Sequence, residues 1–137
     1  MKASIAIYQI LKGDANVLAA VSGIYPQLAK EGTASPYITI MPTDFDPRNT
    51  KDGRTIDYER VNVQINSTDQ RASKDIADDI SAALDGYSGT VTTADESIHI
   101  TRVVLDDITY YMEHEASRTM YIQELEFLVR ERRTSDY

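Results

Sequence analysis

The stretch from Tyr58 to Gly89, YERVNVQINSTDQRASKDIADDISAALDGYSG, predicts a strand that leads directly into a helix. Val61, Val63 and Ile65 alternate with polar residues, and a period of two places three β-branched side chains on one face of a strand. After Ser67 the apolar residues recur every three or four positions, which is the period of a helix with one apolar stripe. The stripe consists of Ala72, Ile76, Ala77, Ile80, Ala83 and Leu84. The rest of the chain is therefore expected to pack on this helix.

Both ends of this helix, predicted over 69–85, carry sequence signals. Ser67 is followed three residues later by Gln70, a spacing in which each side chain can bond the other residue's backbone N–H. Ser67 is therefore predicted to cap the helix. Gly86 follows the last turn, where a residue in the left-handed conformation commonly ends a helix.

Composition favours one soluble globular domain spanning residues 1–137. Hydrophobic residues make up 42% of the chain and charged residues 26%, which is close to globular averages. No apolar run approaches the roughly 18 residues that cross a bilayer, and no basic stretch followed by an apolar core opens the chain, so we expect an unexported protein without a membrane partner. The chain has no cysteine, which excludes disulfides and thiolate chemistry.

The charge balance disfavours DNA binding. The chain carries 22 acidic and 14 basic residues, for a formal net charge of −8. Such a field repels phosphate unless the basic groups cluster.

Two short helices are predicted before the first strand. Residues 4–12 have a broad apolar face, with Ser4 as the expected cap, and residues 15–22 follow Asp14 as a second helix. Residues 24–35 contain Pro, Gly and small polar residues without sustained periodicity, so they are expected to form a connection over the surface.

The next segment predicts a short edge strand and a long loop. Residues 37–41 alternate, and prolines at 36 and 42 bound them, as suits an edge strand. Residues 43–57 are rich in Asp, Asn, Gly, Pro and Arg, so they form either a long loop or an extended hairpin tip. Because long unstructured loops in compact domains are more often functional than decorative, this segment is the best candidate to contact a partner.

The C-terminal half is rich in β-formers. Val91 marks a brief strand, and residues 97–112 follow with a phase slip that predicts a bulge near Arg102. Residues 118–131 carry apolar side chains on both faces, so the second face is expected to be covered by another element or another subunit. The predicted fold is α+β: an antiparallel sheet of about four strands, with one long helix and two short N-terminal helices on one face.

No segment has the pattern of an active site. His99 and His114 are the only histidines, and neither belongs to a pair with metal-ligand spacing. The adjacent acids at 78–79 and 106–107 point in different directions on a helix or strand. There is no nucleophile elbow and no phosphate-binding glycine motif. We therefore expect no catalytic residue, metal or cofactor.

Six short pieces, in this order and spacing, resemble the tail completion proteins of long-tailed bacteriophages, also called the tail terminator or head–tail joining family. The resemblance covers nearly the whole chain, and none of the pieces is catalytic. They are IYQILKGDANVL (7–18), GIYP (23–26), SPYITI (35–40), VNVQIN (61–66), ALDGYSG (83–89) and MYIQELEFLV (120–129).

The resemblance implies a structural virion protein, not an enzyme, assembled in the host cytoplasm. Copies form a ring, commonly six-fold, at the head-proximal end of the tail tube. The ring stops tube growth, contacts the tube protein and the head connector, and lets DNA pass without specific binding. An acidic lumen would let DNA slide.

A ring of identical subunits needs two different contact patches on each copy. For contact between subunits, the two-sided strand suggests Met120, Ile122 and Leu128. For axial contact with the tube or connector, the candidates lie in the loop and are Asp46, Arg48, Lys51, Asp52 and Arg54.

Two alternatives stay open. One is another minor neck or tail component with the same fold. The other is a small α+β enzyme or ligand-binding module with a pocket between helix 69–85 and the sheet, which a polar cavity containing His99 or a buried aspartate would favour.

Overall fold

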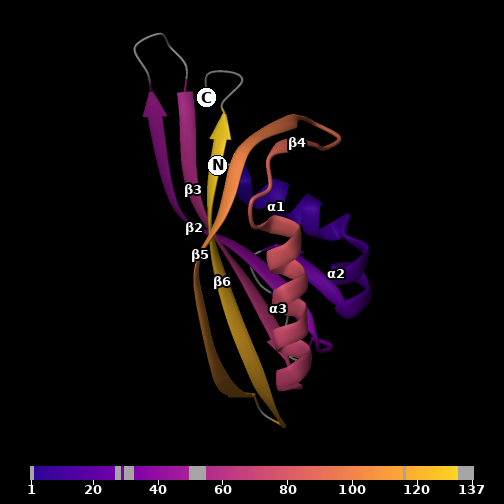
Figure 1. Cartoon of the computed structure of the whole chain (residues 1–137). Helices are drawn as coiled ribbons and strands as arrows, with labels where there is room; N and C mark the ends of the chain where they lie inside the picture. The colour runs from indigo at the N-terminus through magenta and orange to yellow at the C-terminus, as the bar shows by residue number, and fades with distance from the viewer. Residues whose placement is uncertain (1, 27–28, 30–32, 50–54, 116, 133–137) are drawn as a thin grey trace.

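The computed structural model describes residues 2–26, 29, 33–49, 55–115 and 117–132, and it shows a curled sheet with helices on one face (Figure 1). The helices are α1 (Ala3–Lys12), α2 (Ala15–Ala20) and α3 (Gln70–Leu84). The strands are β1 (Gly23–Pro26), β2 (Tyr37–Asn49), β3 (Thr55–Ser67), β4 (Gly89–Thr92), β5 (Ser97–Glu115) and β6 (Arg118–Arg132). The α+β class and the three helices are confirmed, whereas the estimate of four strands is wrong because the sheet has six. No described helix is long and apolar enough to span a bilayer.

The strand order is β1-β2-β3-β6-β5-β4, and every neighbouring pair is antiparallel except β1 with β2. The brief strand at Val91 is confirmed as β4. The predicted connection over 24–35 is wrong at its start, since Gly23–Pro26 pairs in parallel with Tyr37–Ile40. Four residues are too few to show a period, and only the long-range pairing defines this strand.

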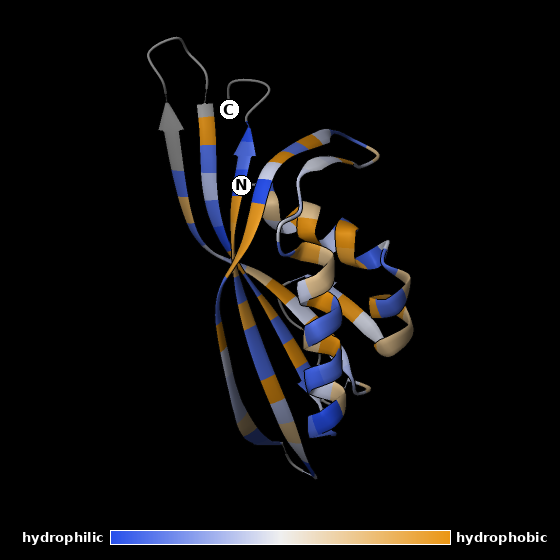
Figure 2. Cartoon of the chain, viewed as in Figure 1, coloured by the Kyte–Doolittle hydropathy of each residue, from blue (hydrophilic) through white to orange (hydrophobic). Residues whose placement is uncertain are grey.

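The core lies between the sheet and the helices, as the central stretch predicts. Val61, Val63 and Ile65 are fully buried on one face of β3, and Ile80 and Leu84 of α3 are buried opposite them. Figure 2 shows hydrophilic and hydrophobic bands alternating along α3, as expected for a helix that buries one side. A buried side chain of this size contributes roughly 1.5–3 kcal/mol to stability.

The segment 43–57 belongs largely to a hairpin, which is one of its two predicted forms. The prediction that Pro42 ends the strand is wrong, because β2 continues to Asn49. A register shift between Pro42 and Asp44 lets the strand pass the proline, which lacks an N–H to donate. Residues 50–54 lie outside the described residues.

The N-cap residue of α3 differs from the predicted one. Ser67 is still part of β3, and Asp69 is the N-cap, where its carboxylate accepts from the backbone N–H groups of Arg71 at 2.9 Å and Ala72 at 3.4 Å. The Ser67 hydroxyl instead accepts from the Asp69 N–H at 3.0 Å. Gly86 has φ +82°, so the predicted left-handed residue after the helix is confirmed.

Replacing Asp69 with alanine should lower the free energy of unfolding by about 1 kcal/mol, because two N–H groups of the first turn lose their acceptor. Urea denaturation measures the change. The matched control is Asp75→Ala, which removes an exposed carboxylate from the middle of the same helix. Equal effects of the two substitutions would show that the cap contributes nothing.

The start of α1 is held by a side chain from the sheet. Ser4 lies inside the helix, so its predicted capping role is wrong, and the N-cap residue Lys2 makes no side-chain cap bond. The buried carboxylate of Glu59 on β3 instead accepts from the backbone N–H groups of Ala3 and Ser4. Burial raises the pKa of Glu59 above its ordinary value of 4.5, with a smaller raising effect from Asp57; the amino terminus and the two N–H groups oppose the rise.

This raised pKa predicts a pH dependence of stability. The folded state keeps a proton on Glu59 at pH values where the unfolded state has lost it, so this group's contribution falls as pH rises from about 4.5 through the folded pKa. Glu59→Gln cannot lose a proton. We therefore expect its stability relative to the unmodified chain to increase from pH 4 to pH 7 in urea titrations, and parallel pH profiles would refute the assignment.

Candidate interaction surfaces

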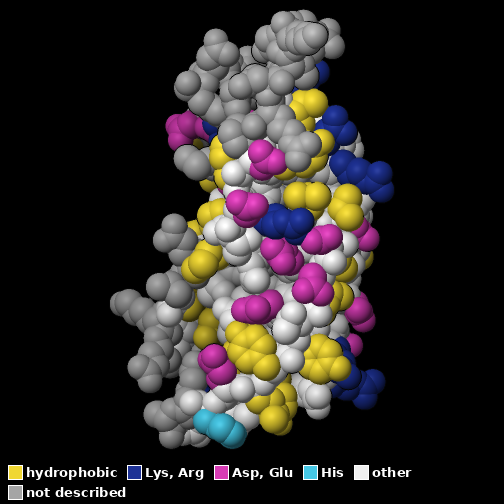
Figure 3. All heavy atoms as spheres, turned by 90° about the vertical axis from the view of Figure 1, so that its left-hand side faces the viewer, with side chains coloured by type: hydrophobic (Ala, Val, Ile, Leu, Met, Phe, Trp, Pro, Cys, Tyr) yellow, Lys and Arg dark blue, Asp and Glu magenta, His cyan; other side chains and the backbone are white. Residues whose placement is uncertain are grey.

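The face of the sheet that carries no helix is acidic (Figure 3). Arg60 lies at its centre, bonded to the Asp106 carboxylate and 3.9 Å from Glu126, and these acids raise the pKa of Arg60. Strand register and these contacts place seven described acids on this face with five described arginines. The acids are Asp44, Asp46, Asp106, Asp107, Glu113, Glu124 and Glu126, and the arginines are Arg60, Arg102, Arg118, Arg130 and Arg132.

A hydrogen-bond chain across four strands fixes part of this face. The Tyr111 hydroxyl on β5 donates to Glu124 on β6 at 3.1 Å, and the Gln64 amide on β3 donates to that hydroxyl at 3.1 Å. Thr39 on β2 donates to Gln64 at 3.0 Å. Burial, followed by the bond to Glu124, raises the pKa of Tyr111. The chain holds the carboxylate in a set position on a polar surface.

A row of large apolar side chains is exposed on β5. Ile108, Tyr110 and Met112 have exposed fractions of 48%, 68% and 60%. Ile108 lies opposite the buried Leu125, so the row is on the same face of the sheet as the helices. Exposed apolar residues are ordinary when single, but three adjacent ones indicate a contact surface.

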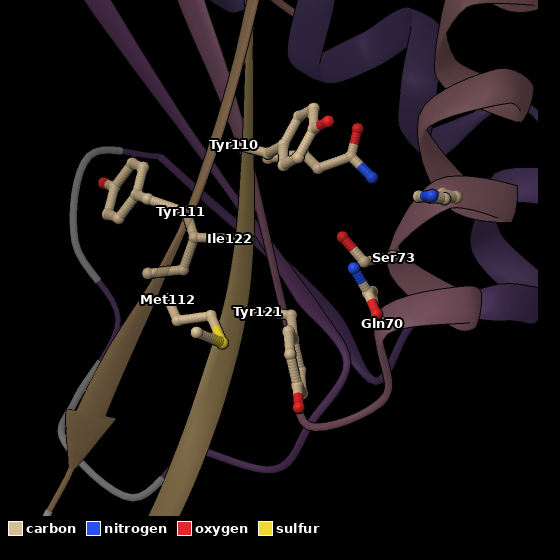
Figure 4. A pocket seen from close by; sticks show the side chains of 9 residues that line it. Gln70, Ser73, Tyr110, Tyr111, Met112, Tyr121 and Ile122 are labelled. Atoms are coloured by element: carbon tan, nitrogen blue, oxygen red, sulfur yellow. The ribbon is translucent and has the colours of Figure 1, made fainter.

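A groove of about 270 Å³ lies beside this row, between α3 and the β5–β6 hairpin (Figure 4). Gln70 and Ser73 of α3 lie across from Tyr110 and Tyr121. The Ser73 hydroxyl is buried and has no hydrogen-bond partner among the described residues. The groove is lined by Gln70, Ser73, Lys74, Tyr110, Tyr111, Met112, Tyr121, Ile122 and Gln123, so neither a histidine nor an acid lines it.

The two-sided strand β6 is covered on its second face within the same chain. Met120 and Ile122 form a small cluster with Tyr37, and Tyr25 and Ala29 pack against it. The rings of Tyr25 and Tyr37 meet edge to face, with centroids 6.2 Å apart. The structure therefore shows the first of the two predicted possibilities, coverage by another element of the same chain. Met120 and Ile122 have exposed fractions of 1% and 2%.

The remaining predicted contact residues do not form one described cluster. Leu128 is half-buried on the helix-free face, opposite Arg60. Asp46 is exposed on β2, and the backbone of Arg48 pairs with Ile56. Lys51, Asp52 and Arg54 lie outside the described residues.

Buried acids do occur, but away from the groove. Asp57, Glu59 and Glu131 are buried at the other end of the sheet, where Glu59 holds α1. His99 bonds Thr90 at 3.0 Å on the short β4–β5 pair. Within the described part of the chain, no three His, Asp or Glu side chains are arranged to hold a metal ion.

Comparison with known proteins points to one family. The family model described as Tail completion protein gp17 matches residues 5–128. A solved chain from the "Virion of native gene transfer agent (GTA) particle" superposes with a TM-score of 0.71 over 95% of this chain and 94% of that chain, at 20% sequence identity. At that identity the likeness concerns the fold. No curated protein matches significantly.

Proposed function

The chain belongs to the family of Tail completion protein gp17 and is a structural protein of a bacteriophage-type tail; from this premise we propose that it closes the head-proximal end of the tail tube and joins the tail to the head connector. The observation that carries the proposal is the family match, which runs from α1 into β6. The exposed surfaces support a role through contacts: one is acidic and one is apolar. The whole chain acts as one domain in the virion, after assembly in the host cytoplasm.

In this proposal, copies of the chain form a ring, most simply of six subunits, around the path of the DNA. The acidic helix-free face lines the channel. Because its described acids outnumber its arginines, it repels phosphate and lets DNA pass without adhering.

The β2–β3 hairpin is the proposed axial contact with the tube or connector. Figure 1 shows these two strands extending beyond the helices. Asp46 and Arg48 lie on this extension, and the predicted residues Lys51, Asp52 and Arg54 belong to the segment that joins its strands.

We place a proposed contact with another tail or neck protein on the exposed row of β5. Met120 and Ile122 already pack inside the chain, so a neighbour reaches them only after Tyr25 and Tyr37 move away. Tyr110 and Met112 need no such rearrangement. Their burial on assembly would remove apolar surface from water.

Mixing the purified chain with purified tail tubes tests the proposal. Negative-stain electron microscopy should show added density at one end of each tube, and capped tubes should not elongate when tube subunits are added. Bovine serum albumin is the control for nonspecific binding. Tubes that stay bare and keep growing at saturating protein would contradict the proposed function.

Reversing charge on the helix-free face should create DNA affinity. The variant Asp44→Lys with Asp107→Lys adds cations to the proposed channel, and each phosphate neutralised should steepen the salt dependence of log K by about 0.9. Retention of short duplex DNA by capped tubes measures the effect. Asp75→Lys with Asp78→Lys makes the same charge change on the exposed side of α3 and should not retain DNA inside the channel. Equal retention by both variants would place the channel elsewhere.

A further inference from the structure

The outer edge of β5 is covered only in its first half. β4 pairs with residues 97–100, and the turn after α3 covers the next part. The Gly86 N–H donates to the Val103 carbonyl at 2.8 Å, and the Val103 N–H donates to the Tyr87 carbonyl at 3.0 Å. The Leu105 N–H donates to the Asp85 carboxylate at 3.0 Å. Beyond Leu105, no described strand pairs with this edge.

The open half directs main-chain groups outward at alternate residues. The main-chain N–H groups of Val103 and Leu105 point away from β6. Because the register shifts between Leu105 and Asp107, Ile108 is the next residue whose N–H points outward. The Ile108 N–H is taken by the Asp107 carboxylate at 3.0 Å. Tyr110 and Met112 follow in outward positions, so their N–H and C=O groups can form a ladder with an added strand.

The opposite edge of the sheet, on β2, is protected against pairing with an added strand, whereas the open edge of β5 is not. Beyond the part paired with β1, strand β2 carries Pro42 and a register shift, and prolines and bulges block edge pairing. The open part of β5, from Ile108 to His114, is ITYYMEH, which contains no proline or glycine and is rich in β-formers. A long exposed edge of this kind is a template for another strand.

We propose that the open edge of β5 binds an extended segment of another tail or neck protein as an additional strand, and that this segment has apolar residues at alternate positions and basic residues at both ends. The inference rests on the proposed function for the identity of the partner. Its physical basis is the edge, the groove beside it and the charges at its two ends.

The charges at the ends of the edge select the partner. Asp107 lies at one end and Glu113 at the other, and both are exposed. The neighbouring Asp106 is already paired with Arg60. A strand with basic residues at both ends places opposite charges across the pair, which is favourable. Apolar residues at its centre fall beside Tyr110 and Met112.

A second copy of this chain fits the edge poorly. Antiparallel pairing of β5 with β5 of another copy, centred on Tyr110 so that the whole open edge pairs, would set Asp107 of each copy opposite Glu113 of the other. Like charges directly opposite destabilise a sheet. The free edge of β2 in another copy offers Pro42 and the acids Asp44 and Asp46, so it repels as well.

The groove gives side chains of the added strand a place to pack. It opens beside Tyr110 and Met112 and reaches Tyr121, and its other wall is the first half of α3. The buried Ser73 hydroxyl there can bond a polar atom of the bound segment. Alternate side chains of an added strand point to this face of the sheet, which is how sheet-edge sites combine main-chain affinity with side-chain selectivity.

Two blocked synthetic peptides test the inference on the full-length chain: Arg-Val-Thr-Val-Thr-Val-Arg and the same peptide with glutamate in place of arginine. NMR spectra of the ¹⁵N-labelled protein should show at least tenfold slower hydrogen exchange at the Tyr110 and Met112 amides with the first peptide and not with the second. Val103, whose N–H is already bonded, serves as the internal control.

Variants separate the ladder from the charges. Tyr110→Pro removes an outward N–H and should abolish the slowing of hydrogen exchange at the Met112 amide. Tyr110→Thr keeps the N–H and should retain that slowing. Asp107→Lys with Glu113→Lys replaces two exposed side chains, also releases the Ile108 N–H from the Asp107 carboxylate, and should reverse the preference between the peptides. This pair gives a clear answer even if the proline variant does not fold.

Each outcome decides something about the edge. No protection by the arginine peptide in a chain that still caps tubes would overturn the inference and leave the proposed function standing. Protection without capping would support the strand site and count against the proposed function. Protection that rises with protein concentration and without peptide would identify a second copy as the occupant and overturn the basic-ended partner.

Discussion

Truncation of Phe127 to alanine should lower the free energy of unfolding by about 3–5 kcal/mol, as expected for a phenyl group removed from a close-packed core. Phe127 is fully buried on β6, the strand between β3 and β5. It lies directly opposite Val61 on one side and Leu105 on the other, so its ring contributes to the layer that both neighbouring strands share with α3. A domain has only about 5–15 kcal/mol of net stability, so the variant should unfold at a markedly lower urea concentration than the unmodified chain.

Urea denaturation followed by circular dichroism measures this loss. Leu18→Ala removes apolar atoms from an exposed position on α2 and should change stability by less than about 0.5 kcal/mol. If Phe127→Ala cost no more than Leu18→Ala, the main core would have to lie elsewhere.

Replacing Tyr110 and Met112 together with aspartate should abolish tube capping while leaving the fold intact. Both side chains are exposed in the free chain, so stability should change by less than about 0.5 kcal/mol for each. In an assembled contact, each charge would be buried without a partner. Loss of even one interface hot spot of about 2 kcal/mol weakens binding roughly 30-fold.

The control for this pair carries the same change at similarly exposed apolar positions. Ile5 on α1 and Leu18 on α2 have exposed fractions of 45% and 52%, and both lie in the helical layer. Ile5→Asp with Leu18→Asp should still cap tubes. Normal capping by the β5 variant, measured as the fraction of tube ends with added density, would show that the row makes no essential contact.

The central strand and helix are predictable because their signals are local. Alternation at Val61, Val63 and Ile65 and the stripe around Ile80 each span several periods, and burial follows the pattern in both. The predicted N-cap of α3, Ser67, is two residues too early because β3 continues through Ser67. That continuation depends on the pairing of Ser67 with Tyr121 on a distant strand.

The strand count could not be read from local pattern. β1 is four residues long and is defined by its pairing with β2, and β2 passes Pro42 by a register shift that a single strand's sequence does not reveal. Glu59 as the acceptor for α1 depends on the packing of a helix against a strand more than fifty residues away. Each of these features results from tertiary contacts.

The exposed row on β5 was missed for a related reason. The predicted bulge near Arg102 is confirmed, but the pairing of β5 with β6 has a second register shift between Leu105 and Asp107. This shift restores Ile108, Tyr110 and Met112 to the helix-side face, beyond the part of that face that α3 covers. Their spacing of two is visible in the sequence, but their exposure depends on the groove that the fold leaves between α3 and the β5–β6 hairpin.

The central claim, that this chain acts by completing a tail, is tested most directly by electron microscopy of particles assembled without it. The account predicts tails of uncontrolled length, or finished tails unattached to heads, and restoration of normal particles when the chain is supplied in trans. Normal virions with tails of uniform length in the absence of the chain would contradict it.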